Sequence, residues 1–272
     1  MAESILTAYL NRIGVRDAPR ADLAGLRLLH EAHAASIPFE NLDILLGRGI
    51  RLDVDSLRAK LIDGRRGGYC FEQNTLFATI LSSLGFEVTM FEARVRVNAT
   101  AVRPRTHMVL GVSIDRRDWL ADVGFGGEGP LEPVPMDGAE SASLGGLRYR
   151  LTSDGELHVL QLRGGMQPAV WVDQYAFVRQ AVHPVDFEMA NWFTSTHPQS
   201  PFVRTLTAQR STRAVRWVLR YPYLTAIGEN ESSTREVGRH ELIDVLRDIF
   251  TIDLPSDTVF PAIDDVAAKC EG

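Results

Sequence analysis

The sequence predicts an α+β fold in which helices come first along the chain and strands follow. Through residues 1–85 apolar residues recur every three or four positions, as they do on one face of a helix. From residue 86 to about 180 they alternate with period two between glycine, proline and aspartate turns, as in strands. The last part mixes both patterns. We therefore predict three regions in the 272 residues, 1–85, 86–190 and 191–272.

The first region is expected to be a bundle of helices, each of which ends at a proline or a glycine. Pro38 stops the second helical pattern, and Gly64 and Gly85 follow the later ones, where a glycine suits the C-terminal cap. The predicted spans are 5–13, 26–37, 55–64 and about 71–84.

The second region is expected to hold short strands. Many short strands separated by turns are typical of an antiparallel sheet that curls toward a barrel. The predicted strands are 86–90, 94–97, 108–114, 119–122, 147–151, 157–162 and 169–172. For the rest of the chain we predict helices at 186–193 and 242–249 and strands at 213–219 and 224–227.

Composition and charge exclude several classes of protein. The net charge of −6 argues against a nucleic-acid partner, which needs a concentrated basic face. The chain has no apolar run of about 18 residues, so we expect no membrane span, and its acidic start makes a secretory signal improbable. Two cysteines, Cys70 and Cys270, form no disulfide framework and are too few for a cysteine-based zinc site. We expect a reducing, cytoplasmic setting and no metal.

The most informative stretch surrounds Cys70. It follows Gly67 and Gly68, where the backbone can turn sharply, and it precedes a predicted helix. In the first turn of a helix, free N–H groups and the positive end of the dipole favour a thiolate over a thiol. A small apolar core residue remains an equally good interpretation of this cysteine.

A nucleophilic cysteine needs a base, and the base needs an acceptor that orients it. His107 lies where an apolar strand begins, and Asp122 lies where the next strand ends. If residues 107–122 form a hairpin, the two side chains can meet on neighbouring strands. Taken singly, His107 could be a half-buried strand residue and Asp122 could start a turn.

A glycine run follows Asp122 at residues 123–130. Its backbone N–H groups could bind phosphate oxygens. The run lacks the Gly-Lys-Ser/Thr ending of a Walker loop and opens no helix, so a nucleotide fingerprint is unsupported. A wide turn is the alternative interpretation.

The segment RGGYCFEQN at residues 66–74 resembles the active-site signature of the arylamine N-acetyltransferases. Further segments match in the order of that family: IPFEN at 37–41, TH at 106–107 and DVGFG at 122–126. The last 80 or so residues match more loosely. The resemblance implies a helical bundle, a β-barrel and a C-terminal α/β lid around a cysteine-protease-like catalytic core.

The resemblance also implies acetyl-coenzyme A as donor and an aromatic amine or hydrazine as acceptor. Cys70 would be the nucleophile, His107 the base and Asp122 the residue that orients it. Further positions carry over to the two substrate pockets. Those expected to border the coenzyme are Thr106, Phe125, Gly126 and Phe202, and those expected to border the acceptor are Phe39, Phe125 and Phe202.

The chemistry expected from this resemblance has two steps, acetylation of Cys70 and then attack by the amine, so the kinetics would be ping-pong. The same three residues could instead serve a thioester hydrolase or an amide synthase. A non-catalytic small-molecule binding protein is a third possibility. Arg103 and Arg105 precede His107 and could contact coenzyme phosphates, although a solvated face is the favoured interpretation. The sequence predicts no oligomeric state.

Overall fold

A computed structural model describes residues 3–141, 146–164, 167–228 and 231–261. Cys270, with the rest of residues 262–272 of the predicted third region, lies outside the described residues.

The first region is helical, as predicted. Ser4 and Asp22 cap the first two helices by accepting hydrogen bonds from Thr7 N and Gly25 N. The predicted helix at 55–64 differs, because its second half is a π-helix in which Gly64 N bonds to Ala59 O at 2.9 Å. The helices are α1 (Ile5–Ile13), α2 (Leu23–Ser36), α3 (Leu42–Leu45), α4 (Val54–Leu57), the π-helix η1 (Arg58–Asp63) and α5 (Cys70–Ser83).

The second region forms a seven-stranded antiparallel sheet with the order β5-β4-β3-β2-β8-β7-β6. Its end strands β5 and β6 contact each other, so the sheet is a nearly closed barrel. The predicted strands 86–90 and 94–97 are one continuous strand, because no turn residue separates them. The strands are β2 (Glu87–Val95), β3 (His107–Ile114), β4 (Arg117–Ala121), β5 (Val134–Pro135), β6 (Arg148–Asp154), β7 (Leu157–Gly164) and β8 (Gln167–Phe177).

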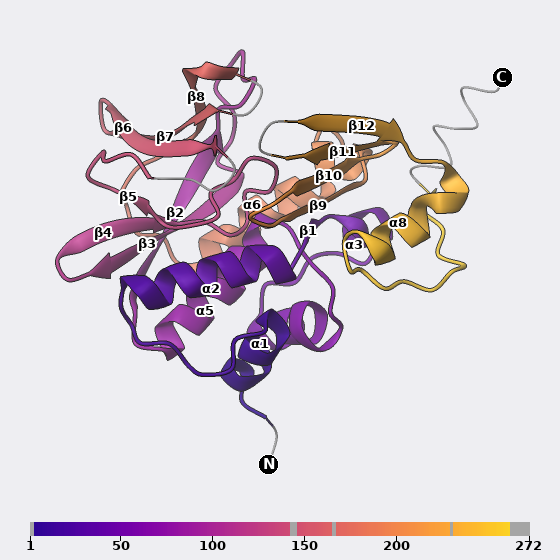
Figure 1. Cartoon of the computed structure of the whole chain (residues 1–272), viewed down its shortest axis with the longest axis horizontal. Helices are drawn as coiled ribbons and strands as arrows, with labels where there is room; N and C mark the ends of the chain where they lie inside the picture. The colour runs from indigo at the N-terminus through magenta and orange to yellow at the C-terminus, as the bar shows by residue number, and fades with distance from the viewer. Residues whose placement is uncertain (1–2, 142–145, 165–166, 229–230, 262–272) are drawn as a thin grey trace.

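A second antiparallel sheet has the order β1-β9-β10-β11-β12. Its strands are β1 (Phe39–Glu40), β9 (Thr207–Ser211), β10 (Arg216–Arg220), β11 (Tyr223–Ile227) and β12 (Ser232–Glu236). The accompanying helices are α6 (Pro184–Thr196), α7 (Pro201–Arg204), the 3-10 helix η3 (Arg239–Glu241) and α8 (Leu242–Asp248). Figure 1 shows the two sheets side by side, with α2 and α5 below them.

Strand β1 belongs to the first region in sequence, yet it pairs with β9, with Phe39 opposite Gln209. The predicted boundary at residue 190 falls inside α6. The three-region division therefore stays a prediction, since the regions interleave in space. We find no helix among the described residues that is long and apolar enough to cross a bilayer.

Strand β3 is buried on both faces, and its alternation decides where His107 points. Met108 and Leu110 pack with the helices, in the core that includes Phe77 of α5. Val109 packs in the barrel interior. Because side chains alternate along a strand, His107 shares the barrel face with Val109. The hairpin to β4 then sets its distance from Asp122.

Candidate active site

Cys70 is the first residue of α5, at the position predicted from the glycines before it. The side chain is buried, with 4% of the residue exposed. Its Sγ lies 3.7 Å from the carbonyl oxygen of Thr106. The sulfur thus sits where the first N–H groups of a helix lack helical partners.

Two glycines give Cys70 its surroundings by leaving room for close approach. A Cβ on Gly68 would lie 2.6 Å from Glu72 Oε2. A Cβ on Gly124 would lie 2.8 Å from the Cα of Cys70. Gly68 does not have a positive φ, so close packing rather than a left-handed turn requires a glycine there. Gly124 brings the loop after Asp122 against the start of α5.

His107 and Asp122 meet on the β3–β4 hairpin. Leu110 pairs with Ala121 across the two strands, which makes His107 and Asp122 diagonal neighbours on one face. His107 Nε2 lies 2.7 Å from Asp122 Oδ2, and both side chains are buried. The hairpin predicted from their spacing is therefore present.

The electrostatics of this pair favour a charged imidazole. Burial alone would lower the pKa of His107, but the charge of Asp122 and the hydrogen bond to it raise that pKa to about 10. Burial would raise the pKa of Asp122, but His107 and hydrogen bonds from Asn74 and Gly124 hold it below its ordinary value. The pair is therefore expected to stay an imidazolium and a carboxylate at neutral pH.

Cys70 lies on the other side of the same imidazole. The side chain of Cys70 adjoins His107 and also contributes to the rise in the pKa of His107. Because Nε2 faces Asp122, Nδ1 is the ring nitrogen left for the sulfur. The structure therefore brings Cys70, His107 and Asp122 together in one chain of contacts.

Asn74 holds the side chain of Asp122 in place, a role that was not predicted from the sequence. Its Nδ2 donates to Asp122 Oδ1 at 2.9 Å and to Met108 O at 2.7 Å. Its Oδ1 accepts from Val123 N at 3.1 Å. The signal was available, because Asn74 lies four residues after Cys70 and therefore on the same helical face.

Two histidines of α2 form hydrogen bonds in the site, one to the backbone of Asp122 and one to the helix α5 that begins at Cys70. His30 Nε2 accepts a hydrogen bond of 3.1 Å from Asp122 N. His33 contacts Gln73 Oε1 through Nε2 at 2.6 Å and the Tyr9 hydroxyl through Nδ1 at 2.8 Å. Burial lowers the pKa of His30 to about 4 and that of His33 to about 3, so both stay neutral near pH 7.

The predicted aromatic pocket is only partly assembled. Phe39, Phe125 and Gly126 line a cavity of about 30 Å³, which has room for water but not for an aromatic ring. Phe202 lines neither this cavity nor a second, larger cavity between α6 and the start of β3. Its ring centroid lies 5.9 Å from that of Phe39. Phe125 meets His107 edge to face at 5.2 Å.

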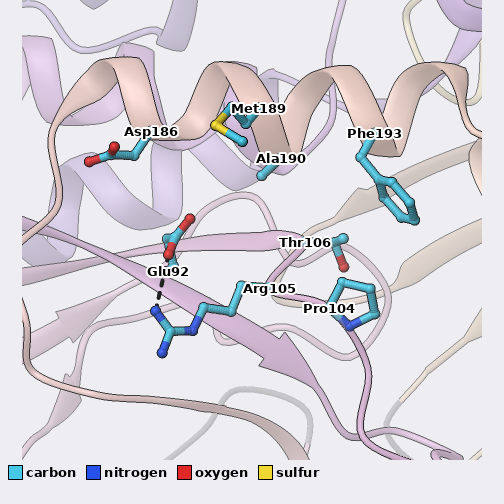
Figure 2. A pocket seen from close by; sticks show the side chains of 8 residues that line it. All are labelled: Glu92, Pro104, Arg105, Thr106, Asp186, Met189, Ala190 and Phe193. Carbon is cyan, nitrogen blue, oxygen red and sulfur yellow. Dashed lines mark hydrogen bonds and ion pairs between the residues drawn. The ribbon is translucent and has the colours of Figure 1, made fainter.

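A larger cavity of about 320 Å³ lies between α6 and the start of β3 (Figure 2). Thr106, predicted to border the coenzyme, lines it, and the carbonyl of Thr106 faces the sulfur of Cys70. Phe193 of α6 lines the cavity too and was missed from the sequence. Arg105 also lines it and donates to Glu92 at 3.3 Å, so its charge is paired with a carboxylate.

Comparison with known proteins identifies the family. The sequence profile of the N-acetyltransferase family matches residues 22–259. The chain is 38% identical over 260 residues to the arylamine N-acetyltransferase of Mycolicibacterium smegmatis, covering 92% of each chain. The chain belongs to the arylamine N-acetyltransferase family. It is accordingly an acyltransferase, and the resemblance inferred from the signature at residues 66–74 is confirmed.

Solved structures agree with this assignment. An arylamine N-acetyltransferase from Salmonella typhimurium superimposes with a TM-score of 0.89 at 31% identity, covering 99% of this chain and 100% of that one. The Mycobacterium marinum enzyme, solved in complex with CoA, gives 0.88 at 33% identity over 96% of this chain and 99% of that one. The predicted α+β fold, with helices and an antiparallel β-barrel, is confirmed.

Proposed function

We propose that this member of the arylamine N-acetyltransferase family transfers acetyl from acetyl-CoA to arylamines, arylhydrazines or N-hydroxyarylamines through an acetyl-Cys70 intermediate. The observation that carries the proposal is the buried His107, which lies between Cys70 and Asp122. The relative solved with CoA supports the choice of donor.

In the first step, the Cys70 thiolate attacks the acetyl carbonyl, a sulfur–carbon bond forms and the bond to the coenzyme sulfur breaks. The coenzyme leaves as a thiolate and takes the proton from the His107 imidazolium. One thioester replaces another, so the step is nearly thermoneutral. The backbone N–H of Cys70, at the start of α5, is the donor we assign to the developing oxyanion.

In the second step, the nitrogen of a neutral aromatic amine attacks the acetyl-cysteine. The neutral His107 accepts the proton of the amine as the carbon–sulfur bond breaks, which restores the thiolate–imidazolium pair. General base catalysis of this kind contributes about 10²–10⁴-fold. Asp122 keeps the ring oriented, and Thr106 and Phe193 line the cavity beside the sulfur through which we propose that substrates approach.

The test is to incubate the protein with acetyl-CoA alone and to map the acetylated peptide by mass spectrometry. We expect one acetyl group on the Cys70 peptide and parallel double-reciprocal lines when an arylamine is added. Cys70→Ala should abolish both, whereas Cys270→Ser should change neither. Acetyl-CoA consumed at full rate without amine would point to a hydrolase, and intersecting lines would contradict the two-step scheme.

A further inference from the structure

Lys60 is an unusual residue for this chain. Of the 29 basic residues, only Lys60 and Lys269 are lysines, and the others are arginines. The Lys60 side chain is only 15% exposed. Its Nζ lies 2.7 Å from Glu72 Oε1 and 2.9 Å from Asp43 Oδ2. A compact ammonium group with three donors can serve two carboxylates at once.

The backbone around Lys60 is unusual as well. The residue lies in the π-helix η1, and its carbonyl accepts a hydrogen bond of 3.0 Å from Arg66 N. Single π-helical turns are rare and occur frequently at functional sites. Here the turn leads directly into the signature segment that carries Cys70.

Glu72 connects the ammonium group to the nucleophile. Its Oε1 accepts from Lys60, and its Oε2 accepts from the backbone N–H of Tyr69 at 3.1 Å. Tyr69 directly precedes Cys70 and is the N-cap of α5. The carboxylate also packs against Gly68, where no side chain would fit. One carboxylate therefore joins Lys60 to the peptide unit beside the reactive sulfur.

We propose that Lys60 is a positioning residue for Cys70, because it holds Glu72 as the carboxylate that fixes the Tyr69–Cys70 backbone at the start of α5. The inference rests on the proposed function in one respect only, that Cys70 is the nucleophile. Lys60 touches no reacting atom and acts through Glu72.

The surroundings of Glu72 give this role a pH dependence. Burial raises the pKa of Glu72 to about 7, Lys60 opposes the rise, and Glu40 adds to it. His107, at about 10, and Asp122, below its ordinary value, do not titrate near neutrality. The groups that act on Glu72 are Lys60 from η1, Glu40 from β1 and the backbone N–H of Tyr69. Asp43 and Arg66 lie one contact further away, Asp43 against Lys60 and Arg66 against Glu40.

The direction of the effect follows from these charges. Above pH 7 Glu72 is ionised and accepts from both Lys60 and the Tyr69 N–H. Below pH 7 it takes up a proton, which weakens both hydrogen bonds. We therefore expect the reactivity of Cys70 to fall as the pH decreases through about 7. Without Lys60 the pKa of Glu72 would rise, so the fall would begin at higher pH.

The experiment measures alkylation of Cys70 by iodoacetamide between about pH 5.5 and 9, with no acyl donor present. The Cys70 peptide is followed by mass spectrometry, and Cys270 in the same chain serves as the reference thiol. In Lys60→Met the midpoint of the decrease should move up by about one pH unit. Lys60→Arg should restore the original midpoint. Glu72→Gln should remove the decrease near pH 7, because an amide does not titrate.

The matched control is Arg58→Met, which removes a cation from the same π-helix. Arg58 pairs with Asp63 at 3.2 Å and makes no contact with Glu72, so the midpoint should stay at the wild-type value. A Lys60→Met profile that coincides with that of the wild type would overturn the proposal. If Lys60→Met does not fold, the Glu72→Gln variant provides the test. A Cys70 alkylation rate that still decreases at the wild-type pH in Glu72→Gln would equally overturn the proposal. Since no donor is used, the outcome is independent of whether acetyl transfer occurs.

Discussion

Asn74 and Asp122 are joined by a hydrogen bond of 2.9 Å that fixes the carboxylate on the far side of His107 from Cys70. Because Asn74 stands one turn after Cys70 on α5, this bond ties the helix that carries the sulfur to the hairpin that carries the base and the acid. The buried amide also satisfies Met108 O and Val123 N. The relative placement of the three groups therefore depends on a fourth residue.

Asn74→Ala should reduce both stability and activity. The substitution leaves a buried carbonyl and a buried N–H without the Asn74 side chain as partner, at about 1–3 kcal/mol for each group, and it removes one of the hydrogen bonds that hold Asp122. We expect a loss of about 2–4 kcal/mol in the free energy of unfolding, measured by urea denaturation. Thr79→Ala is the control, because within the described part of the chain the Thr79 hydroxyl bonds only to Thr75 O of its own helix. Equal effects of the two variants would contradict the role given to Asn74.

Asp122→Asn should preserve the fold and remove most acetyl transfer. An amide in place of the carboxylate supplies no charge to the imidazolium and can donate to Nε2, which favours the wrong tautomer of His107. The expected loss in kcat is about 10⁴-fold, the size of the loss caused by the equivalent change in a serine protease. Circular dichroism should match the wild type. A folded Asp122→Asn variant with near-normal kcat would exclude the proposed orienting role.

The sequence indicated the three candidate catalytic residues because each stands at the boundary of an element. Cys70 begins a helix, His107 begins a strand and Asp122 follows the next strand, and these boundaries were marked by glycines and by apolar runs. No glycine or apolar run indicated the buried ion pair that Glu40 and Arg66 form. Glu40 and Arg66 are both buried, and they compensate each other through a contact of 2.7 Å, with further hydrogen bonds from Arg66 to Asp43 and from Leu42 N to Glu40.

Three strands of the second sheet were also missed, for a different reason: the two-residue β1, β9 and β12. β9 (Thr207–Ser211) and β12 (Ser232–Glu236) are mostly polar and show no apolar alternation. They form because their backbones pair with β10 and β11, and β9 also receives β1 from residues 39–40. Strands that form through backbone pairing with a neighbour, or with a segment as distant as β1 is from β9, are not encoded in local apolar periodicity.

Stability should fall at acidic pH partly because of His33. Its pKa of about 3 in the fold, caused by burial, is below its unfolded value of about 6.5. The unfolded chain therefore binds more protons, so the stabilisation is present above pH 6.5 and is lost as the pH falls toward 3. Between pH 7 and 4.5 the contribution is about 2–3 kcal/mol.

His33→Gln should therefore lose less stability than the wild type between these two pH values, by about that amount. Urea denaturation at both pH values measures the difference. His240→Gln is the control, because the His240 side chain is 86% exposed. If His33→Gln and the wild type lose equal stability on acidification, His33 is not neutral in the fold.

Arg216 of β10 forms hydrogen bonds to the glycine run at residues 123–130, and its removal should weaken the binding of acetyl-CoA. The buried guanidinium donates from Nη1 to Gly127 O at 2.9 Å and to Gly129 O at 2.8 Å. Arg216→Met fills a similar volume but leaves both carbonyls unsatisfied, so we expect a loss of about 2–3 kcal/mol in the free energy of unfolding. Because Gly126 in this loop is proposed to border the coenzyme, KM for acetyl-CoA should rise by about tenfold, equivalent to about 1.4 kcal/mol. Arg220→Met at the exposed end of the same strand is the control, and an identical KM in both variants would show that the loop does not depend on Arg216.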